Sequence, residues 1–69
     1  MGKIEVQLNG ERREIDEGLN VAGLLARLGI PEAIAIVEIN GEVVPKGRFE
    51  EEPVAAGDYV EIIRLMGGG

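Results

Sequence analysis

The sequence predicts an α+β fold in which one main helix packs on one face of a mixed β-sheet, with elements in the order β-β-α-β-β-β. Three observations lead to this prediction. Runs near both ends of the chain alternate apolar with polar residues, as half-buried strands do. A segment between them repeats its apolar residues at helical spacing. Asn-Gly pairs occur twice, and such pairs favour the tight turns that join antiparallel strands. A hairpin, a helix and more strands in one short chain are typical of one helix layer on one sheet layer.

The first hairpin is predicted over residues 3–15. Lys3–Leu8 alternates without interruption, so its apolar residues share one face of a strand. Asn9-Gly10 follows, and both residues tolerate the positive φ of a tight turn. Residues 11–15 return as a second strand that is polar except at Ile15, and Asp16-Glu17-Gly18 ends it.

The helix has sequence signals at both ends. Asn20 is the expected N-cap, because its side-chain oxygen can accept a hydrogen bond from an N–H of the first turn. Gly29 stands where a glycine C-cap belongs, and Pro31 forbids continuation. Gly23 weakens the helix by about 1 kcal/mol relative to alanine. The apolar stripe that faces the sheet consists of Val21, Leu24, Leu25 and Leu28.

Two strands are predicted directly after the helix. Residues 34–39 are nearly all apolar, as expected for a strand inside a sheet. Asn40-Gly41 offers the second tight turn. Pro45 cuts the next strand, Glu42–Val44, short, and this places it at an edge of the sheet.

The last part of the chain combines a loop with a final strand. Residues 46–56 are irregular and acidic, and Phe49 is their apolar anchor. Gly57-Asp58 is a turn, and Tyr59–Arg64 is the final strand.

The composition is that of one folded domain in which only carboxylates, lysines and Tyr59 remain for side-chain chemistry. The chain has 69 residues, which fits a single domain, and 45% of them are hydrophobic, which excludes the composition of a disordered chain. It contains no Cys, His, Ser, Thr or Trp. The usual nucleophiles and the commonest general base are therefore absent, as are disulfides and thiolate metal ligands. We expect a protein that is not an enzyme and has no catalytic residue of its own.

The net charge of the chain excludes some classes of binding partner. The formal net charge is -6, and such a surface repels nucleic acid and anionic membranes, so neither is expected as a partner. No apolar stretch is long enough to span a bilayer, and no apolar signal-peptide core follows Lys3. The expected location is the cytoplasm. Glu50-Glu51-Glu52 is interpreted as a solvated loop, because neighbouring carboxylates do not converge on one metal ion by themselves; no metal site is expected.

Gly67-Gly68-Gly69 ends the sequence shortly after the last strand. Glycine costs more conformational entropy to order than any other residue, so we expect residues 1–65 to form the domain and residues 66–69 to form a flexible tail. Without Cβ atoms such a tail fits a narrow channel, and three extended residues reach up to about 10 Å. It would bring a terminal carboxylate to the active site of another protein. The alternative is a frayed end without function.

The terminal carboxylate would need activation before it could react. Adenylation would convert it to a mixed anhydride that a sulfur nucleophile can attack. The side chains of this sequence offer neither a phosphate cradle nor a metal site for that step. ATP, Mg²⁺ and catalysis would therefore come from a partner enzyme, and no cofactor is expected to be bound.

An exposed apolar patch is predicted beside the tail. If Val37 and Ile62 face the helix, then Ile36 and Ile63 face away from it. Exposed apolar patches often mark partner sites, so this surface is predicted to dock partner proteins. A facing shifted by one residue would bury it, and single exposed apolar residues are ordinary. For Arg64, a surface ion pair is the alternative to a partner contact. The predicted interface residues are Ile36, Ile63, Arg64, Leu65 and Met66.

Four segments, in order and along nearly the whole chain, resemble the ThiS family, the sulfur carrier proteins of thiamine biosynthesis. They are the opening strand of residues 4–10, the helix of residues 20–29, the stretch of residues 37–45, and residues 57–64 leading to the three glycines. The last segment, with Gly-Asp, a strand and the glycine ending, is the most specific of the four. The resemblance implies the ubiquitin-like β-grasp fold.

The resemblance also implies a mechanism. A ThiF-like adenylating enzyme would use ATP and Mg²⁺ to activate the carboxylate of Gly69, and a sulfur donor protein would supply the sulfur that converts it to a thiocarboxylate. Thiazole synthase would then take up that sulfur. Gly68 and Gly69 match the tail of the family, and Gly67 extends it by one residue.

Three other interpretations share the fold and the tail. The small subunit of molybdopterin synthase, similar to MoaD, usually carries proline just before its glycines, whereas this chain has Leu65-Met66. A ubiquitin-like protein modifier would form an isopeptide bond to a lysine. A β-grasp binding domain with an inert tail would do no carboxylate chemistry at all.

Overall fold

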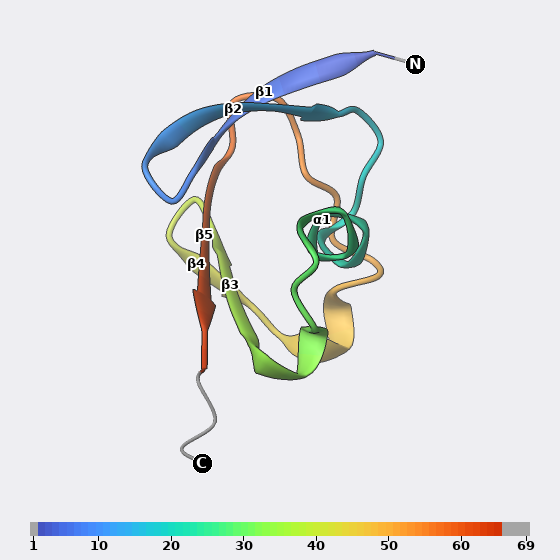
Figure 1. The fold of residues 1–69 in the computed structure, drawn as a ribbon, viewed down its shortest axis with the longest axis vertical. Helices are drawn as coiled ribbons and strands as arrows, with labels where there is room; N and C mark the ends of the chain where they lie inside the picture. The colour runs from blue at the N-terminus through green and yellow to red at the C-terminus, as the bar shows by residue number, and fades with distance from the viewer. Residues whose placement is uncertain (1, 66–69) are drawn as a thin grey trace.

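A computed structural model describes residues 2–65 as a five-stranded sheet with one α-helix beside it (Figure 1). The sheet order is β2-β1-β5-β3-β4, and every neighbouring pair is antiparallel except β1 and β5, which are parallel. This arrangement confirms the predicted mixed sheet with one main helix. The elements are β1 Lys3–Leu8, β2 Glu11–Asp16, α1 Val21–Leu28, β3 Ala35–Ile39, β4 Glu42–Val44 and β5 Tyr59–Arg64, with short 3-10 turns at Glu32–Ile34 and Lys46–Arg48.

The hydrophobic core lies between the sheet and α1, and it is aliphatic except for Phe49. Alternation along each strand sends every second side chain into this core, so β5 buries Val60 and Ile62 and exposes the residues between them. The long loop after β4 contributes as well, because it buries both Phe49 and Val54. The fully or nearly fully buried core residues are Val6, Leu8, Ile15, Val21, Leu24, Leu25, Ile30, Ala35, Val37, Val44, Phe49, Val54, Val60 and Ile62.

Helix α1 begins and ends as its sequence predicts. Asn20 has extended backbone dihedrals, and its Oδ1 accepts a hydrogen bond of 2.7 Å from the Gly23 N–H. Gly29 adopts the left-handed conformation with φ of 73°, which favours glycine over residues with a Cβ. A Cβ at position 23 would lie 3.1 Å from Leu19 Cδ2 and 3.2 Å from Asn20 Oδ1. Glycine at position 23 therefore leaves room for the cap of the helix.

Both Asn-Gly turns bond to β5, the strand in the middle of the sheet. Asn9 has φ of 49°, and its Oδ1 accepts a 2.8 Å hydrogen bond from the Ile62 N–H. Asn40 has φ of 53°, and its Oδ1 accepts a 3.0 Å hydrogen bond from the Tyr59 N–H. The two asparagines thus continue the backbone hydrogen bonding of β5 beyond the ends of β1 and β3.

The start of β3 differs from the sequence prediction. Ile34 was expected in the strand, but it lies in the 3-10 turn Glu32–Ile34 that follows Pro31. The Lys46 ammonium stabilises this turn, since its Nζ donates to the backbone oxygens of Glu32, Ala33 and Ala35 at 2.9, 2.9 and 3.1 Å. The Ile34 carbonyl still accepts a 2.7 Å hydrogen bond from the Leu65 N–H. The hydrogen bonding between β3 and β5 therefore continues one residue beyond the start of β3 and the end of β5.

Candidate functional site

The site of interest is the end of β5, because the predicted tail follows it. Antiparallel pairing with β3 positions this end, with Ile36 opposite Ile63 and Ala35 opposite Arg64. The Leu65 N–H, bonded to the Ile34 carbonyl, is the last backbone contact that the structure describes. The predicted reactive residue Gly69 and the predicted tail and interface residues Gly67, Gly68 and Met66 lie outside the described residues.

The sheet face that points away from α1 carries the predicted apolar patch. Ile63 and Leu65 are each 50% exposed, and Ile36 is half-buried beside Ile63. Val37 and Ile62 are buried on the opposite face. The predicted facing of the two strands is therefore confirmed, and the alternative of a facing shifted by one residue is wrong. A role of this patch in docking stays a prediction.

Acidic residues border the apolar patch on the same face. Glu38 on β3 and Glu61 on β5 are directly opposite each other in the register. Like charges in directly opposite positions destabilise a sheet. On β4, Val43 lies opposite Glu38 and is 62% exposed. The open face thus combines apolar side chains near the end of β5 with negative charge farther from it.

Arg64 lies on the other side of β5, on the face that bears the core. It follows Ile62 by two residues and is exposed. The ion pairs between described residues are Lys3–Asp16, Arg12–Glu5 and Arg27–Asp16, so Arg64 forms none within the described part of the chain. The surface ion pair considered as its alternative role is not formed among these residues.

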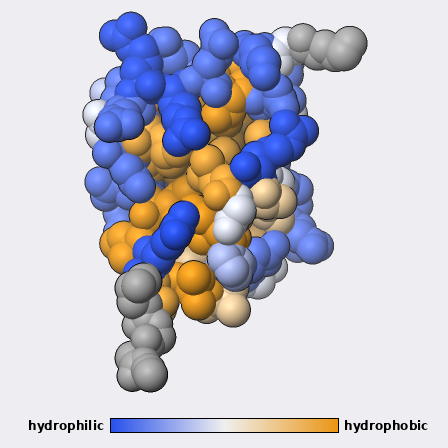
Figure 2. Space-filling view, viewed as in Figure 1, coloured by the Kyte–Doolittle hydropathy of each residue, from blue (hydrophilic) through white to orange (hydrophobic). Residues whose placement is uncertain are grey.

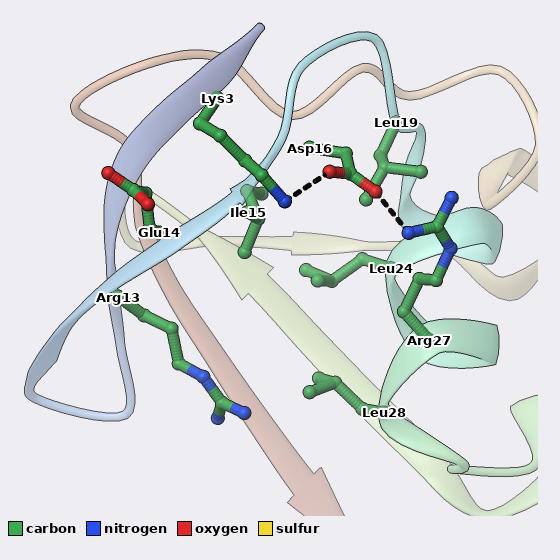
Figure 3. A pocket seen from close by; sticks show the side chains of 9 residues that line it. All are labelled: Lys3, Arg13, Glu14, Ile15, Asp16, Leu19, Leu24, Arg27 and Leu28. Atoms are coloured by element: carbon green, nitrogen blue, oxygen red, sulfur yellow. Dashed lines mark hydrogen bonds and ion pairs between the residues drawn. The ribbon is translucent and has the colours of Figure 1, made fainter. Parts of the chain in front are cut away.

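A second cluster of charges lies between the first hairpin and α1 (Figure 3). The Lys3 ammonium donates to Asp16 Oδ1 at 2.6 Å, and the Arg27 guanidinium donates to Asp16 Oδ2. These hydrogen bonds, with that from Lys3 the stronger cause, hold the pKa of Asp16 below its usual range. Arg13 lines the same pocket but points away from Asp16, toward the end where Leu28 lies (Figure 3).

The described residues show no arrangement typical of a resident metal site or a membrane span. Among residues 2–65, no group of three or more acidic side chains is placed to hold a metal ion. Glu50 and Glu51 are exposed in the loop after β4. The only α-helix of this part of the chain has 8 residues, and no helix within it is long and apolar enough to cross a membrane.

Sequence reasoning missed the side chains that hold β5 and the start of β3 in place. Asn9 and Asn40 were predicted as turn residues, but their contacts to β5 depend on strands that are adjacent only in the folded chain. Lys46 was assigned to an irregular loop, yet its ammonium donates to two carbonyls before β3 and to that of Ala35, the first residue of β3. The positive φ that Asn-Gly pairs favour was the available signal for the two asparagines, and the sequence holds no comparable signal for Lys46.

The sequence and the fold of this chain are both similar to those of one protein family. Residues 6–69 match the model of the ThiS family. The chain is 36% identical over 66 residues to the sulfur carrier protein ThiS of Bacillus subtilis, covering 93% of this chain and 98% of that protein. A crystal structure of the thiamine biosynthesis protein ThiS from Geobacter metallireducens superimposes with a TM-score of 0.80 and 38% identity, covering 96% of this chain and all of that one.

The chain is also similar to one segment of a much longer protein. A thiazole synthase of Paramagnetospirillum magneticum is 36% identical over 66 residues, which are 96% of this chain but 20% of that protein. The chain therefore spans about a fifth of the length of this relative. A segment like this chain can thus be part of a longer polypeptide that carries the name thiazole synthase.

Proposed function

The chain belongs to the ThiS family, and from this we propose that it is a sulfur carrier of thiamine biosynthesis whose Gly69 carboxylate holds the sulfur. The observation that carries the proposal is the match of residues 6–69 to the family, because it includes the glycine triplet as well as the folded body. The β-grasp arrangement of the ThiS structure from Geobacter metallireducens supports it. The chain is a carrier and a substrate of partner enzymes, not a catalyst.

The proposed chemistry takes place at the terminal carboxylate. One oxygen of the Gly69 carboxylate attacks the α-phosphorus of ATP on a ThiF-like adenylating enzyme, and pyrophosphate leaves. A hydrosulfide, delivered by a sulfur donor protein, adds to the carbonyl carbon of the acyl adenylate. AMP then leaves with the former carboxylate oxygen, and Gly69 keeps a thiocarboxylate. ATP and Mg²⁺ belong to the partner, and the carrier binds no cofactor of its own.

The body, residues 1–65, and the tail, residues 66–69, have different roles in this proposal. The body holds the root of the tail, since β5 is bonded to β3 as far as the Leu65 N–H. The tail is thin enough to enter the active site of a partner, because glycine carries no Cβ. The apolar patch of Ile36, Ile63 and Leu65, with Arg64 and Met66, docks the adenylating enzyme and thiazole synthase.

Thiazole synthase is the proposed acceptor of the sulfur. The long relative with that name, which includes a segment similar to this chain, supports the assignment. Offering the thiocarboxylated chain to thiazole synthase and, separately, to the large subunit of molybdopterin synthase tests it. Conversion of the thiocarboxylate to the carboxylate by thiazole synthase alone is expected, and conversion by the molybdopterin subunit alone would assign the chain to that pathway.

A one-residue extension tests whether the terminal carboxylate is the reactive group. An alanine added after Gly69 leaves the body intact and moves the carboxylate by one residue. We expect the extended chain to bind the adenylating enzyme but to accept no sulfur, because its carboxylate lies one residue beyond the position that the enzyme activates. Equal sulfur loading of the extended and original chains would contradict the proposal that the carboxylate must stand at residue 69.

A further inference from the structure

The end of β5 has one paired edge and one open edge. The Asn40 N–H donates to the Tyr59 carbonyl at 2.7 Å and the Leu65 N–H donates to the Ile34 carbonyl. Backbone N–H and C=O groups alternate in direction along a strand. These two bonds therefore show that the N–H and C=O groups of the odd-numbered residues of β5 point toward β3. The N–H and C=O groups of the even-numbered residues therefore point to the opposite edge.

On that opposite edge, β1 ends before β5 does. The Asn9 N–H donates to the Val60 carbonyl at 2.9 Å, and the Asn9 carboxamide bonds to the backbone of Ile62. Arg64 is the next residue whose backbone N–H and C=O groups point to this edge, and the described residues provide no strand beside it. Its backbone donor and acceptor form an open strand edge, which is a template for the addition of another strand.

A hollow lies against this open edge. Its volume is about 290 Å³, and β5, the end of α1 and the first hairpin contribute to it. Its apolar lining consists of Leu8, Leu28, Ile30 and Ile62. Figure 2 shows the same feature from outside, as apolar side chains that gather between β5 and α1 with hydrophilic side chains around them.

Two arginines without an ion pair among the described residues line this hollow. Arg13 comes from β2 and Arg64 from β5. Neither belongs to the ion pairs of residues 2–65, whereas Lys3, Arg12 and Arg27 do. The chain has a formal net charge of -6, so two arginines beside an apolar hollow, without an acidic partner in the described part of the chain, form a local positive charge on an otherwise acidic protein. A ligand that fits here has apolar side chains and a negative charge.

We propose that thiazole synthase adds an extended, acidic segment to the open edge of β5 at Arg64, with a carboxylate between Arg13 and Arg64 and apolar side chains in the hollow. The partner assignment rests on the proposed function, because the enzyme that takes up the tail must cover the root of the tail. The added strand extends the sheet beside β5, and those of its side chains that enter the hollow pack on the face that bears the core. One partner segment thereby holds the end of β5 at its edge and on that face.

Amide hydrogen exchange at Arg64 tests the edge directly. In the free carrier its N–H has no partner among the described residues and exchanges rapidly. In the complex with thiazole synthase we expect exchange slowed by about tenfold or more, because a strand bond protects an amide. The Leu65 N–H, already bonded to Ile34, is the internal control. Unchanged exchange at Arg64 in a saturated complex overturns the proposal.

Paired variants separate strand addition from simple charge attraction. Arg64→Ala and Arg64→Pro both remove the guanidinium, but only proline removes the N–H, and an open edge tolerates proline. We expect Arg64→Pro to bind thiazole synthase about fivefold more weakly than Arg64→Ala, from the loss of one hydrogen bond. Equal affinities of the two variants would exclude strand addition. Circular dichroism of both variants establishes that they are folded.

A second pair tests the charge. Arg13→Glu is expected to weaken binding by about tenfold or more, because it places like charges in the hollow. Arg12→Glu, one residue away on β2 and paired with Glu5 rather than lining the hollow, is expected to bind within about twofold of the original chain. Equal effects of the two substitutions would contradict the assignment.

The outcomes also separate this proposal from the proposed function. If the carrier binds thiazole synthase and transfers sulfur while the Arg64 amide exchanges freely, only the docking proposal fails. If the carrier accepts no sulfur from a competent adenylating system, the proposed function fails, whatever happens at Arg64.

Discussion

The asparagines show how single side chains organise this small protein. Each of the three uses both its carbonyl oxygen and its amide nitrogen in hydrogen bonds, and each joins segments that are distant in the sequence or starts an element. Asn20 caps α1 and also donates to the Glu50 carbonyl at 2.9 Å. Asn9 and Asn40 hold β5 from its two sides. Their positive φ, together with these bonds, explains why asparagine precedes glycine at both turns.

Replacing Asn9 with glycine should destabilise the fold without straining the turn. Glycine accepts the φ of 49°, so Asn9→Gly removes the two hydrogen bonds to Ile62 and little else. We expect the free energy of unfolding to fall by about 1.5–3 kcal/mol, from two bonds and the added chain entropy. Urea denaturation measures it. Arg12→Ala in the same hairpin serves as the control, with an expected change within about 0.5 kcal/mol.

Asp16 makes stability depend on pH in the acid range. Its pKa in the folded chain lies below the unfolded value of about 3.9, because Lys3 and Arg27 donate hydrogen bonds to its carboxylate. The stabilisation is therefore present above the unfolded pKa and is lost as the pH falls through the folded pKa. Asp16→Asn should lower the urea midpoint at pH 7, and the difference from the original chain should shrink as the pH falls.

Glu17→Gln is the control for the loss of one carboxylate charge, since Glu17 belongs to none of the ion pairs of the described residues. It should leave the urea midpoint at pH 7 nearly unchanged. A difference between Asp16→Asn and the original chain that is as large at pH 2 as at pH 7 would contradict the role assigned to the carboxylate.

The elements were predictable where their signals are local. Alternation, two Asn-Gly turns and a capped apolar stripe were enough for β1, α1 and β5, because each signal lies within the element that it describes. The 3-10 turn Glu32–Ile34 was not predictable, since it depends on Lys46, which is distant in the sequence. The burial of Val54 depends likewise on the docking of the loop after β4 onto the segment that leads into α1, where the Leu19 carbonyl accepts from the Val54 N–H.

The end of β5 is the element on which partner binding depends in this interpretation. Substitutions on the open face at this end of β5 should therefore leave the stability of the free protein nearly unchanged but lower its affinity for the partner. Ile63→Asp replaces a half-exposed side chain, so we expect little loss of stability and an affinity for the adenylating enzyme lowered by about tenfold or more. Isothermal titration calorimetry measures the affinity, and thermal denaturation measures the stability.

Val43→Asp is the matched control for Ile63→Asp. Val43 is an exposed aliphatic residue on the same face of the sheet, but it lies on β4, opposite Glu38 rather than beside the end of β5. It should change the affinity by less than about twofold. If Ile63→Asp binds as tightly as Val43→Asp, the apolar patch is not the docking surface.

At the scale of the whole molecule, the proposed function combines a folded body with a reactive end that a partner enzyme activates. Composition led us to expect a protein that is not an enzyme, because Cys, His, Ser and Thr are missing from the sequence. The resemblance along the chain predicted the β-grasp fold and the family, and both are confirmed. The hollow with Arg13 and Arg64 could not be predicted, because β2 and β5 come together only through β1.

The carrier chemistry is tested most directly by the intact mass of the chain after incubation with a ThiF-like adenylating enzyme, ATP, Mg²⁺ and a sulfide source. We predict a mass gain equal to the replacement of one oxygen by sulfur, and no gain when Gly69 is deleted. An unchanged mass of the complete chain, with the same enzyme preparation active on another carrier, would contradict the proposed function.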